Sequence, residues 1–325
     1  MKIIDAHLHF CPGREYFDGI AVAAGHENTE EHLREEYRRL GIVHGIVMGN
    51  RGLDCREHRY PKELRYCVGI DTEELEKGYL NREELDRIEE NLRLDTCAGI
   101  KLYPGYTSVY VSDPIYDPVY ELAASYKKPV AIHTGATAGS NALLKYSHPL
   151  TLDEAAVAHP DVQFVMCHIG NPFLMDAAAV LEKNGNMAAD LSGLWEQRMD
   201  VETFCREKRG YVEALQTWIE YVNNYDKFMF GTDWPLVNLE DYIGFIKRLI
   251  PEKAWEKVFY GNAVRIYGEI PSRITLMKAR FLLASPVPLK VMVPVAPSTT
   301  TEDRAWRMAA GSVESAASMA FMAAR

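Results

Sequence analysis

The first apolar segment of the chain carries two histidines at a spacing that suits metal binding. In KIIDAHLHF, from Lys2, the polar residues Asp5, His7 and His9 alternate with apolar ones. Alternate residues of a β-strand point to the same side, so we expect His7 and His9 to face one side together. Two neutral imidazoles at the end of a strand can both bind a divalent metal. Because a lone His-x-His pair also arises by chance, the interpretation needs support from elsewhere in the chain.

Three further residues of ligand type follow other short apolar segments. His133 ends VAIHTG, His168 ends VMCHIG and Asp233 ends FGTDWP, each beside a glycine, proline or turn residue. Each histidine taken singly is as well explained by packing in the core or on the surface. Their common position at the ends of apolar segments instead predicts one site, in which imidazoles and a carboxylate hold a divalent metal.

A second group of polar and aromatic residues lies in segments that could contact a substrate. Arg56 and His58 occur in a long loop after the second apolar segment, and clustered cations there suggest an anionic substrate, although a solvated polar loop explains them as well. Tyr103 could line a pocket, but an aromatic residue at a strand end is as often packed in the core. His148, in YSHPLTLDE, precedes a predicted helix and could reach the site.

Eight short apolar segments must position these residues. They are largely apolar on both faces, as the strands of a buried parallel sheet should be. The segments are residues 2–10, 44–50, 66–71, 98–104, 129–135, 162–170, 186–193 and 228–235. Alternation of strand and helix eight times predicts an α/β fold, a (β/α)8 TIM barrel whose catalytic face is the carboxyl end of the strands. A doubly wound sheet is the alternative, but no G-x-G-x-x-G follows the first segment.

Helical periodicity and start signals occur between most of these segments, for example in residues 29–40, 82–94, 117–128 and 152–160. Asn28 with Glu31, Asn81 with Glu84 and Thr151 with Glu154 have the spacing of a helix N-cap. The last of these pairs is predicted to form a capping box, in which the two residues exchange side-chain-to-backbone hydrogen bonds.

The chain departs from this pattern near its C-terminal end. We expect residues 1–268 to form the barrel and residues 269–325 to be a tail of uncertain order. A proline-rich stretch from Pro286 to Pro297 resembles a linker, and an alanine-rich segment from Thr301 has helical composition. A loosely packed appendage and an added oligomer contact both suit this composition.

Composition excludes several classes of function. The net charge of −10 argues against a nucleic-acid partner. Six scattered cysteines without a C-x-x-C pair argue against a structural zinc knuckle and favour free thiols. Neither a signal peptide nor an apolar run long enough to cross a membrane is evident. The expectation is a cytoplasmic enzyme without a membrane partner, with association into a homo-oligomer left open.

The order of these site residues resembles that of the amidohydrolase superfamily. An HxH on strand one, histidines on strands five and six and an aspartate on strand eight follow its pattern. The words GIKLYPGY, HIGNP, ADLSG, GTDWP and GNAVRIYG are similar to its amidohydrolase-related branch of metal-dependent hydrolases, lactonases and nonoxidative decarboxylases. The resemblance covers residues 1–268.

The resemblance implies a role for each residue. His7, His9, His133 and Asp233 would hold the metal, with Asp233 also accepting a proton from the attacking water. His168 would bind a second metal or act as an acid or base. Lys101 would be a carboxylated bridge between two metals, a partner for a substrate anion or a structural lysine; one metal is our expectation. Zinc suits these ligands, and manganese, iron or cobalt fit as well.

The expected reaction is hydrolysis of a small carboxylate-bearing lactone, ester or amide, since a bound divalent metal lowers the pKa of water from 15.7 to about 7. The alternative is metal-dependent decarboxylation of an aromatic or enol-type acid, which the same residues could perform. A noncatalytic scaffold would not need all of these residues. A phosphoesterase usually has a glutamate where this chain has Lys101.

Overall fold

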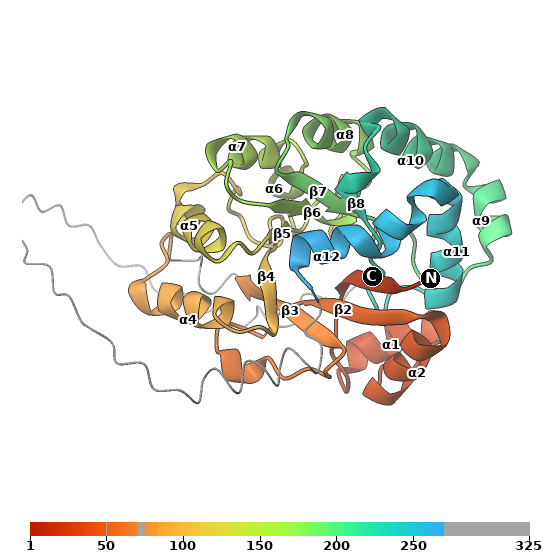
Figure 1. Cartoon of the computed structure of the whole chain (residues 1–325), viewed down its shortest axis with the longest axis horizontal. Coiled ribbons are helices and arrows are strands. Elements are labelled where there is room, and N and C mark those ends of the chain that lie inside the picture. The colour runs from red at the N-terminus through yellow and green to blue at the C-terminus, as the bar shows by residue number, and fades with distance from the viewer. Residues whose placement is uncertain (50, 71–74, 76, 270–325) are drawn as a thin grey trace, which may run out of the picture. The chain divides into compact units, whose positions relative to one another are not determined.

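All eight predicted strands are present in the computed structural model, which describes residues 1–49, 51–70, 75 and 77–269. They are parallel, and each is hydrogen-bonded to the next along the chain (Figure 1). The strands are β1 (Ile3–Leu8), β2 (Ile42–Met48), β3 (Leu64–Ile70), β4 (Cys97–Leu102), β5 (Val130–Ile132), β6 (Phe164–Met166), β7 (Met187–Asp190) and β8 (Phe228–Met229).

The sheet closes on itself between its first and last strands. The backbone N–H of Ala6 in β1 donates to the carbonyl of Phe230, just after β8, at 2.9 Å, and Leu8 forms an isolated parallel bridge with Trp234. Closure brings the carboxyl ends of all eight strands to one face. The predicted (β/α)8 barrel is therefore confirmed.

Helices cover the outside of the strands and connect most of them to the next (Figure 1), whereas β2 and β3 are joined through the 3-10 turn Cys55–Glu57. After each strand the chain forms a loop at the catalytic face, and where a helix follows, it returns the chain to the opposite end of the barrel. The main helices are α1 (Glu15–Ala23), α2 (Glu30–Leu40), α4 (Arg82–Leu92), α5 (Asp117–Tyr126), α6 (Leu144–Ser147), α7 (Thr151–Ala158), α8 (Leu174–Lys183), α9 (Val201–Glu207), α10 (Arg209–Val222), α11 (Leu239–Leu249) and α12 (Asn262–Tyr267).

The starts of these helices agree only partly with the predicted caps. Asn81 and Glu84 exchange both hydrogen bonds of a capping box at α4. The capping box predicted at Thr151 is wrong, because no side chain caps α7 and the Thr151 hydroxyl instead donates to the carbonyl of His148. The cap predicted at Asn28 is also wrong: Thr29 caps α2, while the Asn28 amide donates to the Cys11 carbonyl.

Two apolar layers fill the molecule, one inside the barrel and one between the barrel and its helices. The inner layer consists of small and medium side chains from every second strand position, such as Ile4 and Ala131, and includes Ile266 and Tyr267 of α12. α12 therefore closes the amino-terminal end of the barrel. Arg65 secures it by donating to the Tyr267 carbonyl at 2.7 Å.

The first strand contains an irregularity that separates Asp5 from His7. Asp5 pairs with Gly45 and Leu8 with Val47, so two residues of β1 oppose one residue of β2 between these pairs. Such a bulge shifts the alternation of side chains. Asp5 consequently reaches Tyr37 of α2 in the outer layer, whereas His7 and His9 turn toward Asp233. Strict alternation from Asp5 onward would have predicted one common face for all three residues.

The domain boundary at residue 268 stays a prediction. The features expected between Pro286 and Pro297 and from Thr301 onward lie outside the described residues. In the described part of the chain all six cysteines are free, and no helix combines the length and apolar character needed to cross a bilayer.

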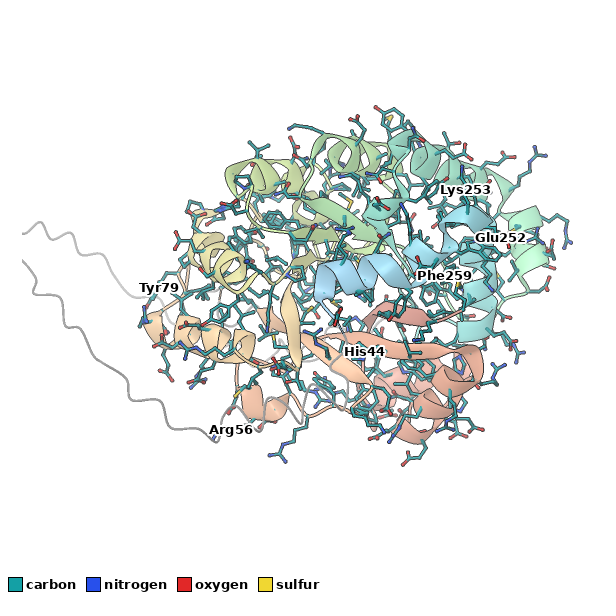
Figure 2. The ribbon with its side chains drawn as sticks, in the orientation of Figure 1. His44, Arg56, Tyr79, Glu252, Lys253 and Phe259 are labelled. Carbon is teal, nitrogen blue, oxygen red and sulfur yellow. The ribbon has the colours of Figure 1, made fainter. Side chains whose placement is uncertain are left out.

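His44 on β2 should make folding stability depend on pH. Its ring is 2% exposed, below α12 in Figure 2, and neither ring nitrogen has a hydrogen-bond partner among the described residues. Burial lowers the pKa of His44 from 6.5 to about 4, and the charge of Arg65 adds to the effect. The neutral ring thus stabilises the fold fully above pH 6.5, and this stabilisation is lost as the pH falls through 4.

We expect the free energy of unfolding of the wild type to lose on the order of 3 kcal/mol more than that of His44→Leu between pH 7 and pH 4. Urea unfolding across this range measures the difference. His159→Leu serves as the control, since His159 lies at the surface beside Asp117. Identical pH profiles for the wild type and His44→Leu would contradict the assignment.

Candidate metal centre

Three of the predicted ligands come together at the carboxyl end of the barrel. His7 lies near the end of β1, His9 follows it, and Asp233 lies in the loop after β8. Asp233 Oδ1 is 3.5 Å from His7 Nε2 and 3.3 Å from His9 Nε2. One ligand atom from each residue lies within 4.8 Å of the other two, so a single ion could contact all three.

The protonation of His7 makes this arrangement fit a cation. His7 Nδ1 is 2.9 Å from a carboxylate oxygen of Asp190, so the ring proton is on Nδ1 and Nε2 carries a lone pair. That lone pair faces the Asp233 oxygen, and neither atom has a hydrogen-bond partner among the described residues. A lone pair facing an anion in a buried site is unfavourable, and a cation shared between the two atoms would make the contact favourable.

The pKa values of His7 and Asp233 also fit a cation site. Burial lowers the pKa of His7 to about 4, against the opposing effect of the Asp190 carboxylate, so no proton joins Nε2 to Asp233 near neutral pH. Burial acts to raise the pKa of Asp233, but the approach of His9 to 3.3 Å and the positive charge that His7 and His168 carry when protonated outweigh it and hold that pKa well below its ordinary value. The site therefore offers the Asp233 carboxylate and the neutral imidazole of His7, the forms that bind metals.

His133 and His168 lie beside this set. The ring centroid of His168 is 4.7 Å from that of His7 and 5.1 Å from that of His133. Neither His133 nor His168 belongs to the group of His7, His9 and Asp233, in which every ligand atom lies within 4.8 Å of the others. His133 Nε2 is 3.1 Å from the Ala136 carbonyl, so Nδ1 is its free ligand atom. Burial lowers the pKa of both rings, and they too are neutral at pH 7. His133 as the fourth ligand stays a prediction.

Two site residues have backbone conformations that side chains other than glycine rarely adopt. His168 has φ 60° and ψ 20°, and Asp233 has φ 59°. Each conformation costs on the order of 1 kcal/mol or more, and such residues cluster at functional sites where the surrounding structure enforces them. For His168 the enforcing contact is the hydrogen bond from its backbone N–H to Asp190 at 3.0 Å. The backbone of these two residues is therefore held in a destabilising conformation, and this conformation sets the directions of their side chains.

Asp190, at the end of β7, was missed as a site residue by the sequence analysis. It is fully buried, and it contacts His7, the backbone of His168 and the hydroxyl of Ser192. Burial acts to raise the pKa of Asp190, but the charge and hydrogen bond of His7 hold it below its ordinary value. The signal was present in ADLSG, where a carboxylate ends an apolar segment as Asp233 does.

Asp5 holds the first strand to the loop that carries Asp233. Its carboxylate accepts hydrogen bonds from the backbone N–H of Thr232 at 2.9 Å, from the Thr232 hydroxyl at 2.6 Å and from Tyr37 at 3.0 Å. Burial raises the pKa of Asp5 to about 7, and these bonds oppose the rise. Asp5 therefore positions the loop that carries Asp233, and it is not one of the three residues that offer a ligand atom.

Lys101 is buried at the end of β4, beneath the histidines. It is 1% exposed, and its Nζ is 2.9 Å from Cys167 Sγ and 5.1 Å from the centre of the Tyr103 ring. No ion pair with a carboxylate is found for Lys101 within the described residues. Its charge contributes to lowering the pKa of His7 and of His133, which places it in the same electrostatic environment.

The other predicted substrate contacts are placed differently. Tyr103 donates from its hydroxyl to the Gly49 carbonyl at 3.0 Å, a packing contact between β4 and β2. The His58 ring stacks on Tyr66 at 4.2 Å. Arg56 is an exposed residue at the periphery (Figure 2), with its side chain 80% exposed and paired to Asp54 at 2.6 Å.

His148 lies between α6 and α7, where its Nε2 is 3.4 Å from Asp176 of α8. Its ring also packs against Phe173 at 4.5 Å. None of the residues Arg56, His58 and His148 has a contact with the ligand set in the part of the chain that the structure describes. Their roles in substrate binding stay predictions.

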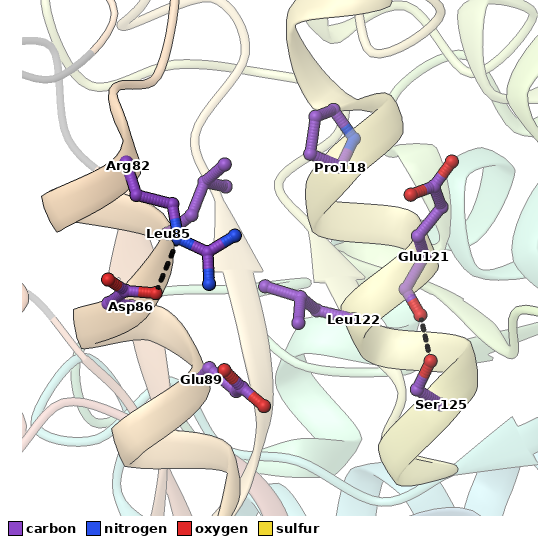
Figure 3. Close-up of a pocket in the computed structure, with 8 residues that line it drawn as sticks. All are labelled: Arg82, Leu85, Asp86, Glu89, Pro118, Glu121, Leu122 and Ser125. Carbon is purple, nitrogen blue, oxygen red and sulfur yellow. Dashed lines mark hydrogen bonds and ion pairs between the residues drawn. The ribbon is translucent and has the colours of Figure 1, made fainter. Parts of the chain in front are cut away.

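A groove on the outer helices was not predicted and has no link to the site. It lies between α4 and α5, has a volume of about 230 Å³ and includes Leu85, Glu89 and Leu122 among its lining residues (Figure 3). Arg82 and Asp86 pair across one turn of α4 at 2.9 Å. Since its charges are on flexible exposed side chains, we assign no chemistry to this groove.

Comparison with known proteins identifies a family that matches the part of the chain forming the barrel. Residues 4–268 match the family model described as amidohydrolase. No curated protein matches the chain. A solved TIM-barrel protein from Bordetella bronchiseptica, described as uncharacterised, is 20% identical, with a TM-score of 0.61, over 84% of this chain and 100% of that one.

Two other solved structures share the fold. An amidohydrolase from Burkholderia multivorans with bound zinc is 16% identical, with a TM-score of 0.58, over 82% of this chain and 99% of that one. A 2,6-dihydroxybenzoate decarboxylase from Rhizobium is 14% identical, with a TM-score of 0.57, over 82% and 98% of the two chains. At these identities the likeness establishes the barrel, and the chemistry must be argued from the site.

Proposed function

We propose a hydrolytic function for this chain, which belongs to the amidohydrolase family, a family of metal-dependent enzymes. The substrate would be a small carboxylate-bearing lactone, ester or amide. The observation that carries the proposal is the buried His7 Nε2, which lies 3.5 Å from Asp233 Oδ1 while neither atom has a hydrogen-bond partner among the described residues. A cation shared between these two atoms would make the contact favourable, and a carboxylate beside a metal is placed to receive a proton from water.

In this proposal His7, His9, His133 and Asp233 hold the metal. When bound, a divalent metal would supply a nucleophilic water at neutral pH and polarise the carbonyl that is attacked. Asp233 Oδ1, which has no hydrogen-bond partner among the described residues, accepts the proton from the attacking water. His168 presents a neutral ring, which can take up the proton that Asp233 received from water and pass it to the leaving group.

Lys101 provides the reason for an anionic substrate. Its ammonium is buried with a thiol as its polar neighbour, and a buried cation is costly until an anion joins it. A carboxylate of the substrate that reached Lys101 would relieve this cost. The metal would be zinc first, as in the Burkholderia structure, with manganese, iron or cobalt also suited to the ligands.

Decarboxylation of an aromatic or enol-type acid is the second candidate. The observation that favours it is the ring of Tyr106, whose centroid is 5.1 Å from that of His133. A flat aromatic side of the site suits a planar substrate, and Lys101 could hold the carboxylate that leaves. His168 or Asp233 would then deliver the proton to carbon.

A substrate panel separates the two reactions. Metal-replete protein is incubated with lactones, amides and hydroxyaryl acids, and ring opening and carbon dioxide release are measured separately. Incorporation of oxygen from labelled water into a carboxylate product is the expected result. Release of carbon dioxide without incorporation of that oxygen would overturn the hydrolase proposal in favour of the second candidate.

A further inference from the structure

A continuous line of hydrogen bonds joins the ring of His7 to the ring of His168 through two residues of the β7 end. Asp190 Oδ2 is 2.9 Å from His7 Nδ1, and Asp190 Oδ1 accepts from the Ser192 hydroxyl. The same hydroxyl oxygen is 2.9 Å from His168 Nδ1. Asp190 and Ser192 are each 0% exposed, so water does not compete for these contacts.

Counting protons along this line fixes the direction of every bond. An ionised carboxylate only accepts, so His7 Nδ1 must carry a proton. The single hydroxyl proton of Ser192 is given to Asp190, so the Ser192 oxygen can only accept from His168. His168 Nδ1 must therefore carry a proton too, and the Ser192 carbonyl, at 3.3 Å, is a second acceptor for it.

Asp190 is held as an acceptor by further donors. The backbone N–H groups of His168 and Ser192 both donate to Oδ1, at 3.0 and 3.1 Å. Donors of this kind favour the ionised carboxylate, and they also fix its position relative to the two rings. The line consequently cannot reverse without breaking at least one buried hydrogen bond.

We infer that Asp190 and Ser192 are positioning residues that set the tautomers of His7 and His168, so that both rings turn a Nε2 lone pair toward the reaction site. The role of these lone pairs rests on the proposed function: one binds the metal and the other receives a proton. His133 has the opposite tautomer, because its Nε2 donates to the Ala136 carbonyl and leaves Nδ1 free. The three rings are thus set individually by their neighbours, which is how residues behind the ligands of a metal commonly act.

Ser192 is the residue whose removal tests the inference most cleanly. In Ser192→Ala the His168 ring loses its near acceptor, while His7 keeps its bond to Asp190. Because the Ser192 backbone carbonyl, at 3.3 Å, is then the remaining and weaker acceptor, we expect His168 to become a mixture of tautomers and His7 to stay protonated on Nδ1. The variant should lose roughly tenfold to a hundredfold in kcat with KM little changed, and Ser192→Thr, which keeps the hydroxyl, should recover the wild-type behaviour.

Long-range proton–nitrogen NMR spectra of metal-free, ¹⁵N-histidine-labelled full-length protein read the tautomers directly, with His7→Gln and His168→Gln assigning the signals. Ser147→Ala is the control matched for burial, since Ser147 is a buried serine that donates to Gly135 at 2.8 Å; its His168 signals should equal those of the wild type. A wild-type His168 protonated on Nε2, or one unchanged in Ser192→Ala, would overturn the inference. This readout needs neither metal nor substrate. The inference can therefore fail while the proposed function is correct, and the proposed function can fail while the inference is correct.

Discussion

Replacing Asp233 by asparagine should lower kcat by roughly a thousandfold, the range expected when a positioned proton acceptor is lost. Asparagine keeps the size of the side chain but neither accepts a proton readily nor carries the charge that faces His7 and His9 at 3.5 and 3.3 Å. Steady-state kinetics on the substrate identified by the panel measures the effect.

The stability of the same variant separates a functional aspartate from a structural one. At neutral pH His7 is unprotonated and supplies no charge to Asp233, so in metal-free protein removal of this carboxylate should leave the thermal midpoint unchanged or higher. An aspartate needed for folding would give the opposite result. Full activity of Asp233→Asn would contradict its assignment as proton acceptor.

Removal of the metal should have an effect of similar size. Prolonged dialysis against a strong chelator should lower activity at least a hundredfold, because the residues that remain supply no group that activates water at neutral pH. Added zinc, manganese, cobalt or iron should restore it to different extents. The restored activity, plotted against metal added, gives the stoichiometry.

Metal binding should also be visible in stability, which supplies an independent readout. A ligand that binds only the folded state stabilises it by about 4 kcal/mol when present at a thousand times its dissociation constant. We expect the thermal midpoint of the metal-free protein to rise on adding zinc and to rise much less in Asp233→Asn. An enzyme that keeps its activity after chelation, with no shift in its midpoint, would contradict a metal-dependent site.

The sequence was sufficient for the barrel because each strand is short, apolar and followed by a loop, which is a strong local signal. It also located His133 and His168 at the ends of β5 and β6, where closure of the sheet brings them beside His7. The strand order of the closed barrel is sufficient to bring these histidines close to His7. Any chain with these strands in this order would place them on one face.

Other features depend on contacts between distant segments and were not predictable. Asp190 lies 183 residues from His7, and nothing in the local sequence pairs them. The bulge in β1 appears only when the register with β2 is known. Arg56 and Lys101 were both considered as cations for a substrate. Arg56 is exposed and paired with Asp54, while Lys101 is buried and has no carboxylate partner within the described residues.

The metal content of His7→Ala tests the central claim most directly. Wild-type protein and the control His159→Ala, which alters a surface histidine beside Asp117, are purified under one protocol and analysed by elemental mass spectrometry. We predict about one equivalent of divalent metal per chain in both, as for a single site of this ligand type, and less than about a tenth of that in His7→Ala. A full equivalent retained in His7→Ala would show that His7 does not bind the metal, and the site described above would be the wrong one.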